Sequence, residues 1–204
     1  MELQKVIEKR RTIRDFSNKT IDQEIIDIAL RAGLKAPSYN HLKQWDFILV
    51  RDLKIRLTLT ESEEMTEEIT DELKKAFEGH DILAKEMYLD AIPKQKKMIL
   101  TAPELLVIIY KPKTQVGESK RVYDLNCLAS VWCCIENILL SLAENDVFGV
   151  TFIPQNTQAV KEALNIPQEL EVAAIIPFGY KALDVKAIPQ KEVLLEEKLH
   201  INNW

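Results

Sequence analysis

The spacing of apolar residues in the first quarter of the chain predicts two helices followed by a strand. A helical period runs over 2–10, and a second amphipathic helix begins near Thr20, which stands three residues before Gln23 as in a capping box. This helix is expected to end within 33–37, where glycine and proline occur. The run WDFILV at 45–50 is short and rich in β-forming residues, so it predicts a strand.

Between 54 and 100 the composition becomes charged and helix-favouring. Pro93 is expected to divide this region into two helices, because proline interrupts a helix interior. The charges are typical of a helix face in water, so we assign them no chemistry, although the region is suited to cover a site as a lid. A helix in its first half is indicated by the spacing of four apolar residues, Met65, Ile69, Leu73 and Ala76.

Strongly apolar segments dominate the second half of the chain. LLVIIY at 105–110 has the pattern of a strand covered on both faces. Residues 123–145 form a helix that is apolar nearly all round, as expected at the centre of the structure or at a dimer interface. VFGVTFI and LEVAAIIPFGY predict two further strands, on either side of a helix at TQAVKEAL. This alternation predicts an α+β fold of mixed α/β type, with helices flanking a single central sheet in one domain over 1–204.

The last residues, 184–204, contain two apolar clusters but are too few to form a core of their own. They end in the buried-type residues Ile201 and Trp204. We therefore expect this C-terminal arm to wrap another surface, for which a second subunit is the simplest candidate.

Composition narrows the class of protein. With a formal charge of −5 and a pI near 5.4, the chain lacks the basic field that nucleic acid or an anionic membrane requires. Its start is charged, without a signal-peptide pattern, and its apolar runs are read as too short to span a membrane. The odd number of cysteines fits a reducing, cytoplasmic compartment, and Cys133 and Cys134 are expected to be buried packing residues. No histidine has metal-ligand spacing, so we predict no metal.

Two polar motifs are candidates for ligand binding. RRTIRDF at 10–16 gathers three arginines and a threonine hydroxyl, and guanidinium groups suit phosphate because they give paired, charge-assisted hydrogen bonds. Alone, such a cluster is more often a solvated patch. APSYNHLKQWDFILV at 36–50 then joins a proline turn, hydroxyl and amide groups, a histidine and a lysine to a strand.

Together these motifs, in this order and spacing, resemble the nitroreductase family of FMN-dependent oxidoreductases, and the resemblance covers essentially the whole chain. It implies a nitroreductase-like fold, a homodimer with exchanged C-terminal arms, and two FMN sites that both subunits build. The first motif would hold the phosphate, ribityl chain and pyrimidine edge, and the second would come from the other subunit. The residues concerned are Arg10, Arg11, Thr12 and Arg14 in the first motif, and Pro37, Ser38, Tyr39, His41 and Lys43 in the second.

Two further segments are similar to parts of that family. GVTFIPQN at 149–156 corresponds to the stretch that offers a backbone N–H to flavin N5; since Pro154 has no N–H, the donor would be Ile153 or Gln155. Lys191 is similar in place to a cation that reaches the phosphate. As a hypothesis, Lys43 or Arg14 lies near flavin N1 and O2, where a cation stabilises the reduced ring.

The resemblance implies a two-step reaction in which NADH or NADPH reduces the flavin and a small electron acceptor, such as a nitroaromatic, quinone or activated alkene, is then reduced. No acid–base pair of side chains is needed, because the flavin carries the chemistry. Three alternatives stay open. The first is a flavin-binding sensor or reservoir without rapid turnover, the second is a cysteine-dependent enzyme, and the third is an interaction protein with an empty groove.

Overall fold

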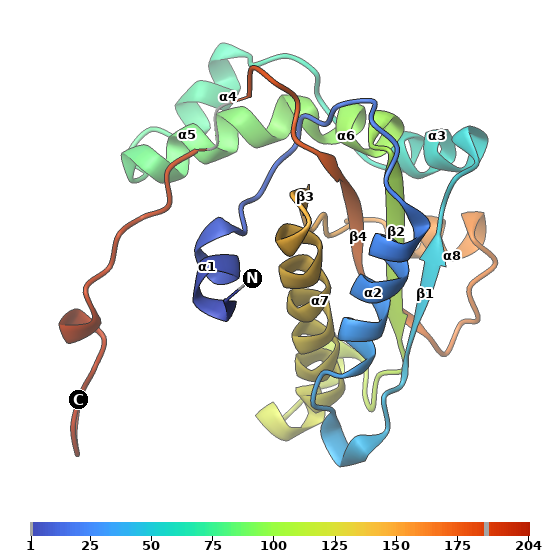
Figure 1. Ribbon diagram of the computed structural model, residues 1–204, viewed down its shortest axis with the longest axis vertical. Coiled ribbons are helices and arrows are strands. Elements are labelled where there is room, and N and C mark those ends of the chain that lie inside the picture. The colour runs from blue at the N-terminus through green and yellow to red at the C-terminus, as the bar shows by residue number, and fades with distance from the viewer. Residues whose placement is uncertain (1, 186–187) are drawn as a thin grey trace.

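The computed structural model describes residues 2–185 and 188–204, which form a single sheet with helices around it (Figure 1). The strands are β1 (Trp45–Leu49), β2 (Glu104–Tyr110), β3 (Val147–Gly149) and β4 (Glu171–Tyr180). The helices are α1 (Leu3–Lys9), α2 (Gln23–Leu34), α3 (Leu53–Glu61), α4 (Asp71–Ala76), α5 (Ile82–Ala91), α6 (Gln95–Thr101), α7 (Asn126–Glu144) and α8 (Thr157–Ala163). The predicted mixed α+β fold with one central sheet is confirmed.

The sheet has four antiparallel strands in the order β1-β2-β4-β3. Every residue of β2 is buried, as its apolar run predicted, because the side chains alternate between two cores. Leu106 and Ile108 belong to the core under α2 and α7, whereas Leu105 and Val107 belong to the core under α3, α6 and α8. The fold therefore has three layers, with β3 at one edge of the middle layer.

Helix α7 occupies the centre, and its closest neighbour is α2. Gly33 allows this approach: a Cβ added there would lie 2.8 Å from Ile138 Cγ1 and 2.9 Å from Cys134 Sγ. The helical run Val122–Glu144 is long and apolar enough to cross a membrane by length and composition alone. Its buried face packs against α2 and the sheet, which is the arrangement of a core helix, through residues that include Val131, Cys134, Ile135, Ile138 and Leu142.

The cover region, residues 54–100, lies across one end of the sheet in Figure 1, where α5 and α6 follow one another. The helix predicted from the spacing of Met65 and Ile69 is wrong in its first half, because regular helix begins only at Asp71. Thr66 Oγ1 accepts from the N–H of Glu68 at 3.3 Å, a local bond that competes with helical pairing. The predicted division near Pro93 is confirmed, as a short 3-10 turn at Ile92–Lys94 between α5 and α6.

Two other boundaries differ from expectation. α2 begins at Gln23 with Asp22 as its N-cap and no side-chain capping bond, so the predicted capping box at Thr20 is wrong. Ile21 packs in the core, and the helix begins only after this buried residue. The strand predicted at VFGVTFI is regular only over Val147–Gly149, and Phe152 adds one isolated bridge to Ile175.

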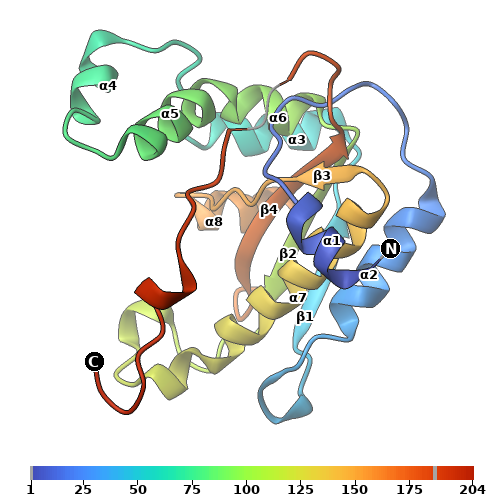
Figure 2. The same cartoon turned by 60° about the vertical axis from the view of Figure 1, so that its left-hand side comes forward.

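The C-terminal arm leaves the body past α5 in both views (Figures 1 and 2). It contains one short 3-10 turn, Leu195–Glu197, and its described residues beyond Ile188 are all exposed. Trp204 is 100% exposed and Ile201 is 74% exposed. The predicted exchange of this arm between subunits stays a prediction.

Candidate functional site

The basic segment 10–16 leaves α1 and runs beside the outer edge of β3. Thr12 forms a parallel bridge with Gly149, and Phe16 forms an antiparallel bridge with Lys181, just after β4. The segment is therefore attached to the sheet at both ends, which limits where its side chains can reach.

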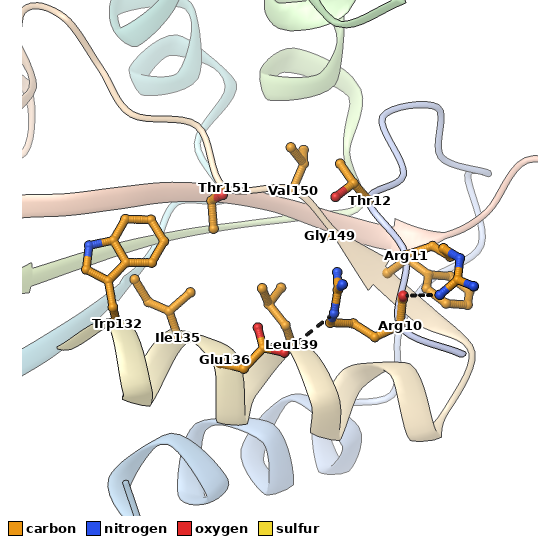
Figure 3. A pocket seen from close by; sticks show the side chains of 11 residues that line it. Arg10, Arg11, Thr12, Trp132, Ile135, Glu136, Leu139, Gly149, Val150 and Thr151 are labelled. Carbon is orange, nitrogen blue, oxygen red and sulfur yellow. Dashed lines mark hydrogen bonds and ion pairs between the residues drawn. The ribbon is translucent and has the colours of Figure 1, made fainter. Parts of the chain in front are cut away.

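A cavity of about 280 Å³ lies between this segment and α7. Figure 3 shows the α7 side chains rising from below toward the strand, with Arg10 and Arg11 at one end and Thr12 above them. Guanidinium and hydroxyl groups at one end and apolar side chains along the floor suit a ligand with a phosphate and a flat apolar part. The other lining residues are Trp132, Ile135, Glu136, Leu139, Phe148, Gly149, Val150 and Thr151.

The two arginines of this cavity are held differently. Arg10 Nε lies 3.5 Å from Glu136 Oε1, so a carboxylate partly neutralises the cationic end of the cavity. Arg11 Nη1 donates to the Arg10 carbonyl oxygen at 2.8 Å and to the Glu8 carbonyl oxygen, so it caps the C-terminal end of α1. A guanidinium has five N–H donors, which leaves further donors for a bound anion.

A second cavity, of about 440 Å³, shares Arg11 and Thr12 with the first and reaches the cover region. Its charged residues are Arg11, Arg14, Asp81 and Lys191, and Lys191 Nζ lies 3.4 Å from Asp81 Oδ2. The basic segment thus joins two adjacent cavities. The remaining lining residues are Leu83, Ala84 and Met87 of α5 and Ile188, Pro189 and Gln190 of the arm.

Arg14 faces the second cavity and enters an ion-pair network with the cover region. Its Nη1 lies 3.2 Å from Asp90 Oδ2, and Lys94 bridges Asp90 to Asp15, whose Oδ2 is 2.7 Å from Lys94 Nζ. Burial lowers the pKa of Arg14, against the opposing effect of Asp90. Burial alone would raise the pKa of Asp15, but the hydrogen bonds and charges of Lys94 and Lys97 outweigh it and lower that pKa. The network ties the basic segment to α5 and α6.

The second motif lies elsewhere in the same chain. Pro37, Ser38 and Tyr39 line a separate, open cavity of about 340 Å³ against α7, beside Ser130 and Cys133. The N–H of Tyr39 donates to Ser130 Oγ at 2.9 Å, which positions the loop on the helix. In one chain, the two motifs therefore line different cavities along α7.

Lys43 and His41 are the remaining two residues of the second motif. Lys43 Nζ donates to the carbonyl oxygens of Leu34 at 2.5 Å and Ala36 at 3.2 Å, so Lys43 satisfies the C-terminal end of α2. Its hypothesised place near flavin N1 and O2 stays a prediction, and in this structure two of its donors meet backbone carbonyl oxygens. His41 has a φ of 56° in a tight turn and its side chain is exposed.

The loop Ile153–Asn156, which is expected to offer a backbone N–H to a flavin, bonds to the cover region in this structure. The N–H of Gln155 donates to Glu63 Oε2 at 3.0 Å, so this N–H is engaged by the cover region. Pro154 is buried and Ile153 is 52% exposed. In the described part of the chain, Ile153, Pro154 and Gln155 line neither of the two cavities that contain Arg11. Thr151, which the sequence analysis did not select, lines the first.

Glu136 is the functional candidate that sequence reasoning missed most clearly. It is the one charged residue inside the apolar run of α7 before Glu144. An isolated charge in such an apolar helix indicates a candidate functional residue, so the sequence could have identified it. Asp81 and Asp90, which pair with Lys191 and Arg14, were missed because they lie among the many charges of the cover region.

The cysteines are not all buried. Cys134 is buried and Cys127 half-buried, whereas Cys133 is exposed, which corrects the expectation for Cys133. Adjacent residues of a helix point about 100° apart, so one faces the core and the other the solvent-facing side of α7. Burial raises the pKa of the Cys134 thiol to about 12, which makes it a poor nucleophile.

Comparison with known proteins connects this arrangement to a family. Iodotyrosine deiodinase of Thermotoga neapolitana is 27% identical over 189 residues, which is 92% of this chain and 92% of that protein. An Archaeoglobus fulgidus protein, named for NADH dehydrogenase or NAD(P)H nitroreductase activity, is 27% identical over 98% of this chain and 97% of its own. The crystal structure of oxidized iodotyrosine deiodinase, bound to FMN and 3-iodo-L-tyrosine, superposes with a TM-score of 0.73 at 24% identity, over 99% of this chain and 100% of that one. The nitroreductase family model matches residues 7–180, and the chain belongs to the nitroreductase family.

Proposed function

We propose that the protein is an FMN-dependent oxidoreductase that takes electrons from NADH or NADPH and reduces a small electron-poor molecule. The observation that carries the proposal is the pair of joined cavities, which combine guanidinium and hydroxyl donors with apolar walls. FMN has the matching parts, a phosphate and a flat ring system. The residues present therefore fit this cofactor.

Within the chain, Arg10, Arg11 and Thr12 would bind the phosphate and ribityl chain, and Lys191 would add a third cation from the arm. Trp132 and Leu139 exclude water from the floor of the cavity. When bound, FMN supplies hydride-transfer chemistry that no side chain provides. The chain's residues contribute binding, orientation and electrostatics.

A homodimer is part of the proposal. The first cavity, at about 280 Å³, is just below the size range of ligand sites, so a whole FMN needs walls beyond those that line it. Apolar residues are exposed on several elements, including Leu3 at 68%, Leu194 at 63% and Trp204 at 100%. Such surfaces favour contact with a second copy of the chain. Sedimentation should give twice the chain mass, and removal of residues 193–204 should shift it toward the monomer and weaken FMN binding.

The deciding experiment is the visible spectrum of the purified protein, before and after denaturation and after anaerobic addition of NADH or NADPH. Flavin absorption that denaturation releases and nicotinamide bleaches is the expected result. Bound flavin that does not bleach would favour the sensor or reservoir. A protein that takes up no FMN would favour an interaction protein. Loss of turnover in a Cys133→Ser, Cys134→Ala variant that still binds FMN would favour the cysteine-dependent enzyme.

Reductive deiodination of an iodinated tyrosine is a second candidate, which the end-to-end match to the Thermotoga protein favours. 3-Iodo-L-tyrosine and a nitroaromatic acid should be compared as acceptors with one electron donor. Release of iodide at a rate above that of nitro reduction would select the deiodinase; the reverse order would select the broader reductase. The reduced cysteines lead us to propose a cytoplasmic location for either activity.

A further inference from the structure

A carboxylate of the cover region holds the loop Ile153–Asn156, which follows Thr151 of the first cavity. Glu63, just after α3, accepts from the N–H of Gln155 through Oε2 and from the N–H of Asn156 through Oε1, both at 3.0 Å. Both oxygens are used on two successive backbone donors, which lie more than ninety positions later in the chain. An ionised carboxylate offers two equivalent acceptors, so it suits this contact better than an amide or a hydroxyl group.

Within the described part of the chain, Gln155 and Asn156 make no other long-range hydrogen bond. Pro154 is buried and has a fixed φ. Asn156 Oδ1 accepts from the N–H of Ala159 at 3.1 Å and so begins α8. The packing of Pro154 holds one point of the loop, but neither feature attaches the backbone of Gln155 and Asn156 to another part of the molecule. Glu63 supplies that attachment.

The preceding backbone donors alternate in direction. The N–H of Val150 donates to Pro177 O at 3.3 Å and that of Phe152 donates to Ile175 O at 2.8 Å, both toward β4. Since successive N–H groups of an extended chain point to opposite sides, those of Thr151 and Ile153 point away from β4, to the outer edge of the sheet. Among the described residues, neither has a hydrogen-bond acceptor.

We propose that Glu63 is a positioning residue for the cofactor site. By engaging the N–H groups of Gln155 and Asn156, it fixes the loop that follows Thr151, so that the N–H group of Thr151, a residue that lines the first cavity, is available to an acceptor atom of the cofactor ring. This inference rests on the proposed function and deepens it. It also makes the loop dependent on the cover region, because displacement of the segment after α3 releases both bonds.

The attachment itself is tested without cofactor, by residue-resolved amide hydrogen exchange of the apo protein. Glu63→Ala should speed exchange of the Gln155 and Asn156 amides by at least about tenfold, since each loses a charged acceptor. Glu63→Gln, which keeps one acceptor oxygen, should give an intermediate effect. Glu64→Ala is the matched control, because this neighbouring glutamate is exposed and should leave both rates unchanged.

The positioning role is tested by the dissociation constants of FMN and riboflavin and by the flavin midpoint potential. Glu63→Ala should raise both dissociation constants by about tenfold and shift the potential, because the altered contact is to the ring that the two ligands share. Equal exchange in the wild type and Glu63→Ala, or faster exchange with unchanged affinity and potential, would overturn the inference about Glu63. Failure of the wild type to bind any flavin would instead overturn the proposed function.

Discussion

The close approach of α2 to α7 predicts that Gly33→Ala destabilises the protein, although alanine is normally better in a helix. A methyl group at this position would lie 2.8 Å from Ile138 Cγ1, 2.9 Å from Ile138 Cδ1 and 2.9 Å from Cys134 Sγ. Real contacts of this kind are rarely below 3.0 Å. The side chains of α7 or the whole helix must therefore move, and α7 carries the floor of the first cavity.

Two opposing effects set the magnitude. Replacing glycine by alanine in a helix interior gains about 0.5–1 kcal/mol, whereas overpacking a core typically costs 1–3 kcal/mol. Part of the strain is relieved because Ile138 Cδ1 is the end of a flexible side chain. We expect a net loss of roughly 1 kcal/mol, which lowers the melting temperature by about 2–4 °C in a chain of this length.

Urea unfolding measures this loss, and a double-mutant cycle identifies its cause. Ile138→Ala removes two of the three close contacts, so in that background Gly33→Ala should become neutral or stabilising, with a coupling of about 1–3 kcal/mol. Gly117→Ala is the control, because no atom lies within 4 Å of its added Cβ. If Gly33→Ala raised stability in the wild-type background, the packing argument would be refuted.

Three further predictions concern charge and protonation. Glu136→Gln should tighten FMN binding by up to about fivefold, since it removes a carboxylate beside the anion site. Riboflavin, which lacks the phosphate, should bind unchanged, and an equal gain for riboflavin would contradict this prediction. Cys134 should resist alkylation at pH 8 until the protein unfolds, because burial raises its pKa to about 12; labelling at the rate of an exposed thiol, seen by mass spectrometry, would contradict it. Asp15 has a lowered pKa in the folded protein, so its ion pairs with Lys94 and Lys97 stabilise the fold above the unfolded carboxyl pKa and are lost as the pH falls through the folded value. Asp15→Asn should therefore flatten the acid limb of the stability profile below about pH 4, and an unchanged limb would show that other groups dominate it.

Sequence patterns predicted the continuous apolar segments correctly, because such segments are stable only when they are buried. A continuous apolar strand such as 105–110 is stable inside a sheet covered on both faces, and the apolar helix over 123–145 needs an apolar surface to pack on, which the sheet and α2 provide. Weak amphipathic spacing was less reliable. Residues 65–70 have helical spacing, yet hydroxyl groups bond locally to the backbone there, and Thr70 caps α4 through a bond from Leu73 N.

For the site, the sequence alone determined the types of group available and their family pattern: a basic segment, a proline turn and a polar loop. Tertiary structure decided what each group meets. Lys43 reaches the carbonyl oxygens at the end of α2, Gln155 donates to Glu63, and Arg10 lies beside Glu136. The reason is physical: local patterns report neighbours within about one helical turn, whereas hydrogen bonds and ion pairs form with whichever partner the packed helices and sheet bring within reach.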